Sequence, residues 1–166
     1  MLPLVQLRRL TAATLVCAAV VLGLSFLIGT PQAAPAGGVA TTHTCSAADK
    51  QFLLTVSSNM EQLQYWSDSL QSGDATAAVV IKQAHAESEQ VAVTGPTDPS
   101  LQTARSLLRK MFLEYGSAVK ARALGSPPGP HVRNAYTLAN GGHELLVQAE
   151  PGMTAKGCDL TPLLKS

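Results

Sequence analysis

Apolar residues recur every three or four positions through most of the chain, which restricts it to helical folds. The first such segment follows Ser46-x-x-Asp49, in which Ser46 can accept a hydrogen bond from the first helical turn and Asp49 suits the positive end of the helix dipole. Gly73 is expected to end this helix. Its stripe covers eighteen residues in five steps, the 3.6-residue period of an α-helix: Phe52, Val56, Met60, Leu63, Trp66 and Leu70.

Two further helices are predicted between Gly73 and the proline-rich stretch at 126–130. Asp74 is the expected cap of the second, which Gly95-Pro96 should end. Asp98-Pro99, a capping residue followed by proline in the first helical position, opens the third. The stripe of the second is Ala77, Ile81, Ala84 and Val91; that of the third is Leu101, Ala104, Leu108, Met111, Tyr115, Ala118 and Arg122.

A fourth helix is predicted over Val132–Glu150, closed by Pro151-Gly152 and followed by a tail of fourteen residues. Gly141-Gly142 lies in its middle, where each glycine costs about 1 kcal/mol relative to alanine. Either the helix kinks at this pair or another part of the chain approaches it closely. The stripe of this helix is Val132, Tyr136, Ala139, His143 and Leu146.

An uncharged run of nineteen residues, Leu10–Ile28, directly follows two arginines. As a helix it would cover roughly 28 Å, close to the hydrocarbon thickness of a bilayer. Because residues 29–49 carry no Lys or Arg, the N-terminus is expected inside and the remainder outside. An A-x-A pattern ending at Ala36 is typical of a cleaved signal peptide, whereas the length of the run favours a retained membrane anchor. The alanine-rich composition and this export segment favour a bacterial source.

The predicted domain order is a signal peptide or transmembrane anchor at 1–29, a flexible linker at 30–44 and a helical bundle at 45–166. Short connections favour an antiparallel up-down-up-down four-helix bundle. In that topology Cys45 and Cys158 lie at the same end, and an even pair of cysteines in an exported domain is typical of a disulfide. Metal binding and a reactive thiol are the alternatives, but neither cysteine belongs to a C-x-x-C motif.

Composition and motifs argue against two classes of function. Residues 37–166 carry ten Lys or Arg against eleven Asp or Glu, with no basic cluster that would bind nucleic acid. The chain has no G-x-S-x-G, no H-E-x-x-H and no glycine-rich phosphate loop. We therefore expect neither a nucleic-acid-binding protein nor an enzyme, and no catalytic residue is assigned.

His143 is the candidate ligand of a cofactor, because the stripe of the fourth helix turns it towards the core. Tyr136 and Tyr115 could join it around haem or a metal, although residues at this spacing also serve simply to fill a core. A c-type haem is excluded because the chain has no C-x-x-C-H motif. His85 and Glu89 are expected to form an exposed pair one helical turn apart.

Short pieces around Asp49 and His143 resemble an exported, ferritin-like bacterial helical family of unknown function. That family carries aspartate-histidine pairs, whereas this chain has Ala84 before His85 and Gly142 before His143, so no family is assigned. The expected function is that of a non-enzymatic cell-envelope module that binds an envelope protein or a membrane component. The alternative is a periplasmic or secreted carrier of a small ligand, haem or metal, held near His143. The protein would lie at the outer face of the cytoplasmic membrane, or be secreted if it is cleaved near Ala36.

Overall fold

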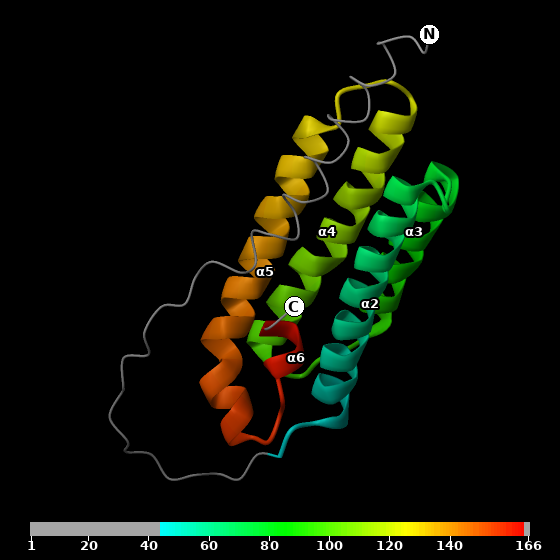
Figure 1. The fold of residues 1–166 in the computed structure, drawn as a ribbon. Coiled ribbons are helices and arrows are strands. Elements are labelled where there is room, and N and C mark those ends of the chain that lie inside the picture. Colours follow the sequence, from blue (N-terminus) through cyan, green and yellow to red (C-terminus); the bar gives the residue numbers. More distant parts are fainter. Residues whose placement is uncertain (1–43, 165–166) are drawn as a thin grey trace, which may run out of the picture.

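The computed structural model describes residues 44–164, and every regular element in that range is an α-helix. The predicted all-α class and the count of four long helices are confirmed. Among these residues no helix is both long and apolar enough to cross a membrane. The predicted signal or anchor segment at 1–29, cleavage near Ala36 and all but the last residue of the linker at 30–44 lie outside the described range. Figure 1 shows the elements: α2 (Ala47–Ser72), α3 (Ala77–Val93), α4 (Pro99–Ala123), α5 (Gly129–Ala155) and the short α6 (Thr161–Leu164).

Most helix ends lie where local chemistry predicts them. The Ser46 hydroxyl accepts a hydrogen bond from the Asp49 amide at 3.0 Å and caps α2. At the other end of α2, Gly73 adopts a left-handed conformation with φ of 86°, which a residue with a side chain rarely adopts. Asp98 caps α4 by accepting from the Ser100 amide at 2.9 Å, and Pro99 is the first residue of that helix.

The expected cap of α3 was wrong. Thr76 occupies the N-cap position, and its hydroxyl accepts from the Val79 amide at 3.4 Å. Asp74 lies two residues earlier, so its carboxylate is not at the cap and instead accepts a hydrogen bond from the Ser72 hydroxyl at 2.5 Å.

Both expected bounds of the fourth helix were also wrong. Helix α5 begins at Gly129 rather than Val132, and it continues through Pro151 to Ala155. Proline removes one hydrogen bond of a helix, but here only four helical residues follow it. The added turn contains Met153, whose side chain is fully buried, and its carbonyl accepts hydrogen bonds from the amides of Lys156 and Cys158. We attribute the continuation of the helix to this burial.

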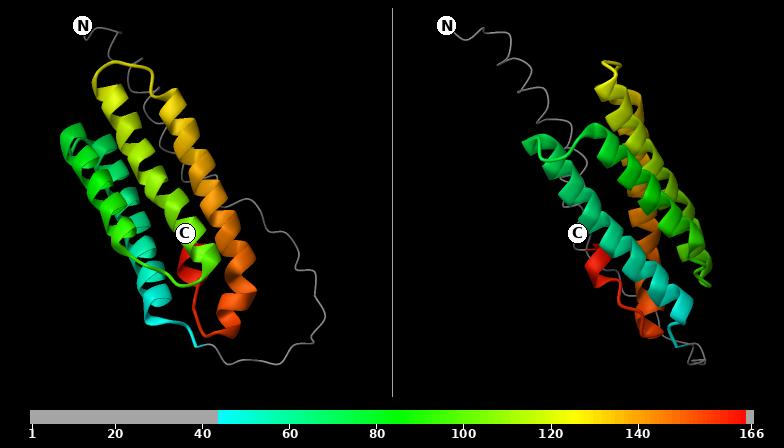
Figure 2. Two further views of the ribbon diagram at one scale, coloured as in Figure 1. Left: turned by 180° about the vertical axis from the view of Figure 1, so that it is seen from behind. Right: turned by 90° about the vertical axis from the view of Figure 1, so that its right-hand side faces the viewer.

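Helix α4 packs closely against both α3 and α5 and lies between them, as Figure 1 and the left-hand view of Figure 2 show. Small residues permit these approaches. A Cβ on Gly116 of α4 would lie 3.3 Å from Cβ of Ala84 on α3, and a Cβ on Gly142 of α5 would lie 2.9 Å from Cδ2 of Leu108 on α4. The glycine pair of α5 is therefore explained by a close approach. The predicted seam of α4 is buried except at its last member, Arg122, which is exposed.

The first prediction compares two glycines of α5. Gly142→Ala should lower the free energy of unfolding by about 1–2 kcal/mol, because the new methyl group would overpack against the buried Leu108. Gly152→Ala should raise it by roughly 0.5–1 kcal/mol, because nothing lies within 4 Å of the added Cβ and alanine is the better helix former. Urea denaturation measures both changes. Equal effects of the two substitutions would contradict the close approach.

Candidate functional site

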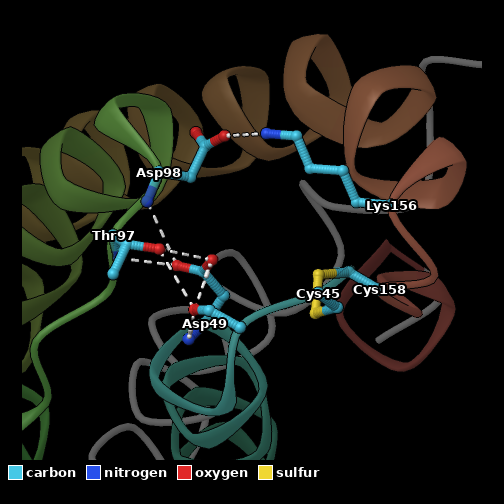
Figure 3. The surroundings of a disulfide bond; sticks show 7 residues. Cys45, Asp49, Thr97, Asp98, Lys156 and Cys158 are labelled. Atoms are coloured by element: carbon cyan, nitrogen blue, oxygen red, sulfur yellow. Dashed lines mark hydrogen bonds and ion pairs between the residues drawn. A yellow bond between two sulfur atoms is a disulfide. The ribbon is translucent and has the colours of Figure 1, made fainter. Parts of the chain in front are cut away.

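One end of the bundle is closed by a disulfide that joins the residues flanking the first and last long helices. Cys45 directly precedes α2 and Cys158 follows α5, and their Cα atoms are 5.1 Å apart in the bonded pair. The Cys45 amide also donates a hydrogen bond to the Lys156 carbonyl at 2.5 Å. The predicted pairing is confirmed, and the chain just before α2 lies beside the chain just after α5 (Figure 3).

A second tie at this end centres on the buried carboxylate of Asp49 (Figure 3). One oxygen accepts from the backbone amides of Thr97 and Asp98, at 2.7 and 3.1 Å. The other accepts from the hydroxyls of Ser46 and Thr97, at 2.7 and 2.8 Å. Burial raises the pKa of Asp49, but these hydrogen bonds outweigh it and hold the pKa below its ordinary value of 3.8.

A third tie joins the start of α4 to the end of α5. The Lys156 ammonium donates to the Asp98 carboxylate at 3.0 Å. Burial raises the pKa of Asp98, but the contact with Lys156 and the hydrogen bonds from the Ser100 and Leu101 amides outweigh it and hold the pKa below its ordinary value. Asp49 holds both Thr97 and Asp98, and Asp98 pairs with Lys156, so α2, α4 and α5 are linked at this end.

Beside these ties, an open groove of about 240 Å³ lies between α2 and the chain that follows the disulfide. Its walls are mostly apolar, with Lys50 and Asp159 as charged members. Leu54 and Pro162 are the exposed apolar residues of the groove, and 67% of the surface of Leu54 is accessible. The complete lining is Lys50, Leu53, Leu54, Ser57, Gly157, Asp159, Pro162 and Leu163.

The short helix α6 forms one wall of this groove. The buried side chains of Leu160 and Leu163 anchor it, and it contacts both α2 and α5. Sequence reasoning treated this part of the chain only as a tail that carries a cysteine and so missed the groove. Two signals were present: Leu54 is apolar but lies outside the stripe of its helix, and the tail carries near its end an apolar cluster of Leu160, Pro162, Leu163 and Leu164.

The structure does not bring the three candidate cofactor residues into one cavity. His143 is half-buried and lines a cavity of about 20 Å³, which has room for about one water molecule. Neither tyrosine lines this cavity. The buried Tyr115 hydroxyl lies 2.7 Å from the Ser67 hydroxyl on α2, and Tyr136 is exposed on α5. Within residues 44–164, no three His, Cys, Asp or Glu side chains are arranged to hold a metal ion.

His85 and Glu89 are both exposed on α3, as predicted. The recorded partner of Glu89 is Arg109 on α4, at 3.3 Å, so this carboxylate ties two helices together rather than pairing along its own helix. Such exposed pairs contribute little to stability.

The second prediction concerns Asp49. Asp49→Asn should lower the free energy of unfolding by at least about 2 kcal/mol at pH 7, because hydrogen bonds to a charged acceptor are lost or reversed. Because the pKa of Asp49 is lower in the folded state, its carboxylate adds stability that is present above pH 3.8. That stability is lost as the pH falls through the folded-state pKa. The difference between the variant and the wild type should therefore fade below pH 3.8 in acid-unfolding curves. Asp68→Asn, an exposed change on the same helix, is the control, and an equal loss there would contradict the role of Asp49.

No family model, curated protein or solved structure matches this chain. The groove, the three ties and the residues around His143 are therefore the basis for the function proposed below.

Proposed function

We propose that residues 45–166 form an antiparallel up-down-up-down bundle, exported to the outer face of the cytoplasmic membrane or secreted. The support for this topology is that each long helix is joined to the next by a short connection and packs against it: α2 on α3, α3 on α4, and α4 on α5. The support for export is the uncharged run Leu10–Ile28 together with a disulfide, which is typical of oxidising compartments.

The function we propose is that of a non-enzymatic module of the cell envelope that binds a segment of another exported protein. The observation that carries this proposal is the apolar groove between α2 and α6. Its volume of about 240 Å³ is smaller than the roughly 300–1,000 Å³ typical of small-molecule sites. It suits one or two apolar side chains of a peptide better than a planar cofactor.

The position of the groove also suits binding. The disulfide and the Asp49 network hold its walls, so little conformational entropy needs to be lost when a partner binds. Lys50 and Asp159 place one charge of each sign at the groove, so the favoured segment carries an apolar centre flanked by an acidic and a basic residue.

The third prediction tests this groove by photo-crosslinking in the intact chain within its own envelope. A benzophenone amino acid is placed at Leu54, and separately at Leu124, which is equally exposed but lies at the end of α4. We expect a discrete adduct with one envelope protein from position 54, and none from position 124. Lys50→Glu should reduce the yield of the adduct, because it reverses one charge at the groove.

Two results would overturn the proposal. The first is equal labelling from positions 54 and 124, which indicates random contact. The second is a complete absence of adducts from position 54 while the protein is folded and exported. If position 54 instead crosslinks to a lipid, the partner of the groove is a membrane component and the proposed protein partner is wrong.

The fourth prediction concerns the alternative function, a carrier of haem or metal near His143. Because the cavity there holds about one water molecule, we expect the purified protein to show no haem absorbance, no bound metal and no uptake when either is offered. Absorbance spectroscopy and metal analysis measure this. An absorbance band that appears with haem and is lost in His143→Ala would favour the carrier instead.

A further inference from the structure

The most unusual polar group of the described core is the side chain of Glu87 on α3. Only 1% of this residue is exposed, and neither carboxylate oxygen has a hydrogen-bond partner. The hydroxyl of its neighbour Ser88 is likewise buried and without a partner. An ionised carboxylate in such surroundings is strongly disfavoured, whereas the protonated form can be buried at a much lower cost.

Glu87 lies where α3 meets α2. The Asn59 side-chain amide, itself fully buried on α2, donates to the Glu87 backbone carbonyl at 3.1 Å. The contact with α4 lies one helical turn earlier on α3, where Ala84 and the Ile81 carbonyl are close to Gly116. Ionisation of Glu87 would therefore act on the packing of α3 against its neighbours, and Asn59 of α2 is the side chain bonded to the backbone of Glu87 itself.

Among residues 44–164, no charged group is placed to stabilise an ionised Glu87. The residue that α2 presents there, Asn59, is neutral. On α4, Arg105 donates to the carbonyl of the C-terminal cap of α3, and Arg109 pairs with the exposed Glu89. Burial accordingly raises the pKa of Glu87 from 4.5 to about 7.

Among the contacts between long helices, the contact of α2 with α3 is the one that ionisation of Glu87 can loosen most easily. Helix α4 packs extensively against α3 and α5, whereas α2 packs less closely against the rest. The start of α2 is held by the disulfide and by Asp49, but the contact with α3 at Asn59 lies more than two helical turns further along.

We propose that the contact between α2 and α3 is a pH-sensitive latch, closed when Glu87 is protonated and loosened when it is ionised. The latch opens around Asn59 in the middle of α2, while the disulfide holds the start of α2 and the Ser67–Tyr115 hydrogen bond joins its later part to α4. A raised pKa gives stability that is fully present below pH 4.5 and is lost as the pH rises through about 7. The latch therefore favours the closed state in a mildly acidic exterior.

The fifth prediction uses Trp66, the single tryptophan of the chain, as the reporter. Trp66 lies on α2 two turns after Asn59, on the same face, and packs partly buried against the core. In the intact chain, we expect its emission to shift to longer wavelength with a midpoint near pH 7. Between pH 5.5 and 8.5 the Tm should fall by roughly 5–10 °C.

Glu87→Gln should abolish both transitions, because it retains the shape of the side chain and removes the titrating group. Glu87→Met, an apolar residue of similar length, should do the same and keeps the test decisive if the amide variant folds poorly. Glu89→Gln and His85→Gln, two exposed changes on the same helix, should leave both transitions unchanged. The proposal is overturned if the wild type shows no transition near pH 7, or if the transition persists without the Glu87 carboxyl.

Discussion

The buried carboxylate of Asp49 is the interaction on which the arrangement of this domain depends. It sits in the first turn of α2, yet it accepts hydrogen bonds from the two residues that lead into α4. One of these, Asp98, caps α4 and also pairs with Lys156 at the end of α5. A single acidic residue thus positions the start of two helices, and the disulfide beside it holds the chain that follows the last one.

This concentration of ties at one end divides the domain into parts of unequal rigidity. Helices α3, α4 and α5 pack through small residues at Ala84, Gly116 and Gly142, and this close packing makes them one layer. Helix α2 is fixed at its start by these ties and nearer its end by the Ser67–Tyr115 hydrogen bond, and it meets α3 through the buried Asn59 and Glu87. The rigid end carries the groove that we propose as a binding surface, and the α2–α3 contact carries the group that we propose as a pH sensor.

The success of sequence reasoning differed between elements for physical reasons. The start of α2 and the start of α4 depend on local hydrogen bonds within a few residues, so Ser46 and Asp98 could be recognised as caps. The end of α5 depends on burial of Met153 against distant parts of the chain, and no local signal at Pro151 reports that. The stripe of α3 has a gap between Ala84 and Val91, and the buried Glu87 and Ser88 fill it. That gap was the one available signal of a polar group in the core.

The sequence by itself determined the helical class, most helix ends and the pairing of Cys45 with Cys158, because each follows from short-range periodicity, capping or the two cysteines that lie beyond the predicted export segment. It also placed His143 on the stripe of its helix. Only the tertiary structure decided that this histidine faces a cavity the size of one water molecule, that Tyr115 bonds to Ser67, and that α6 and Leu54 form a groove. These features depend on which helix faces overlap in space, and the distances between faces are set by packing of residues far apart in the chain.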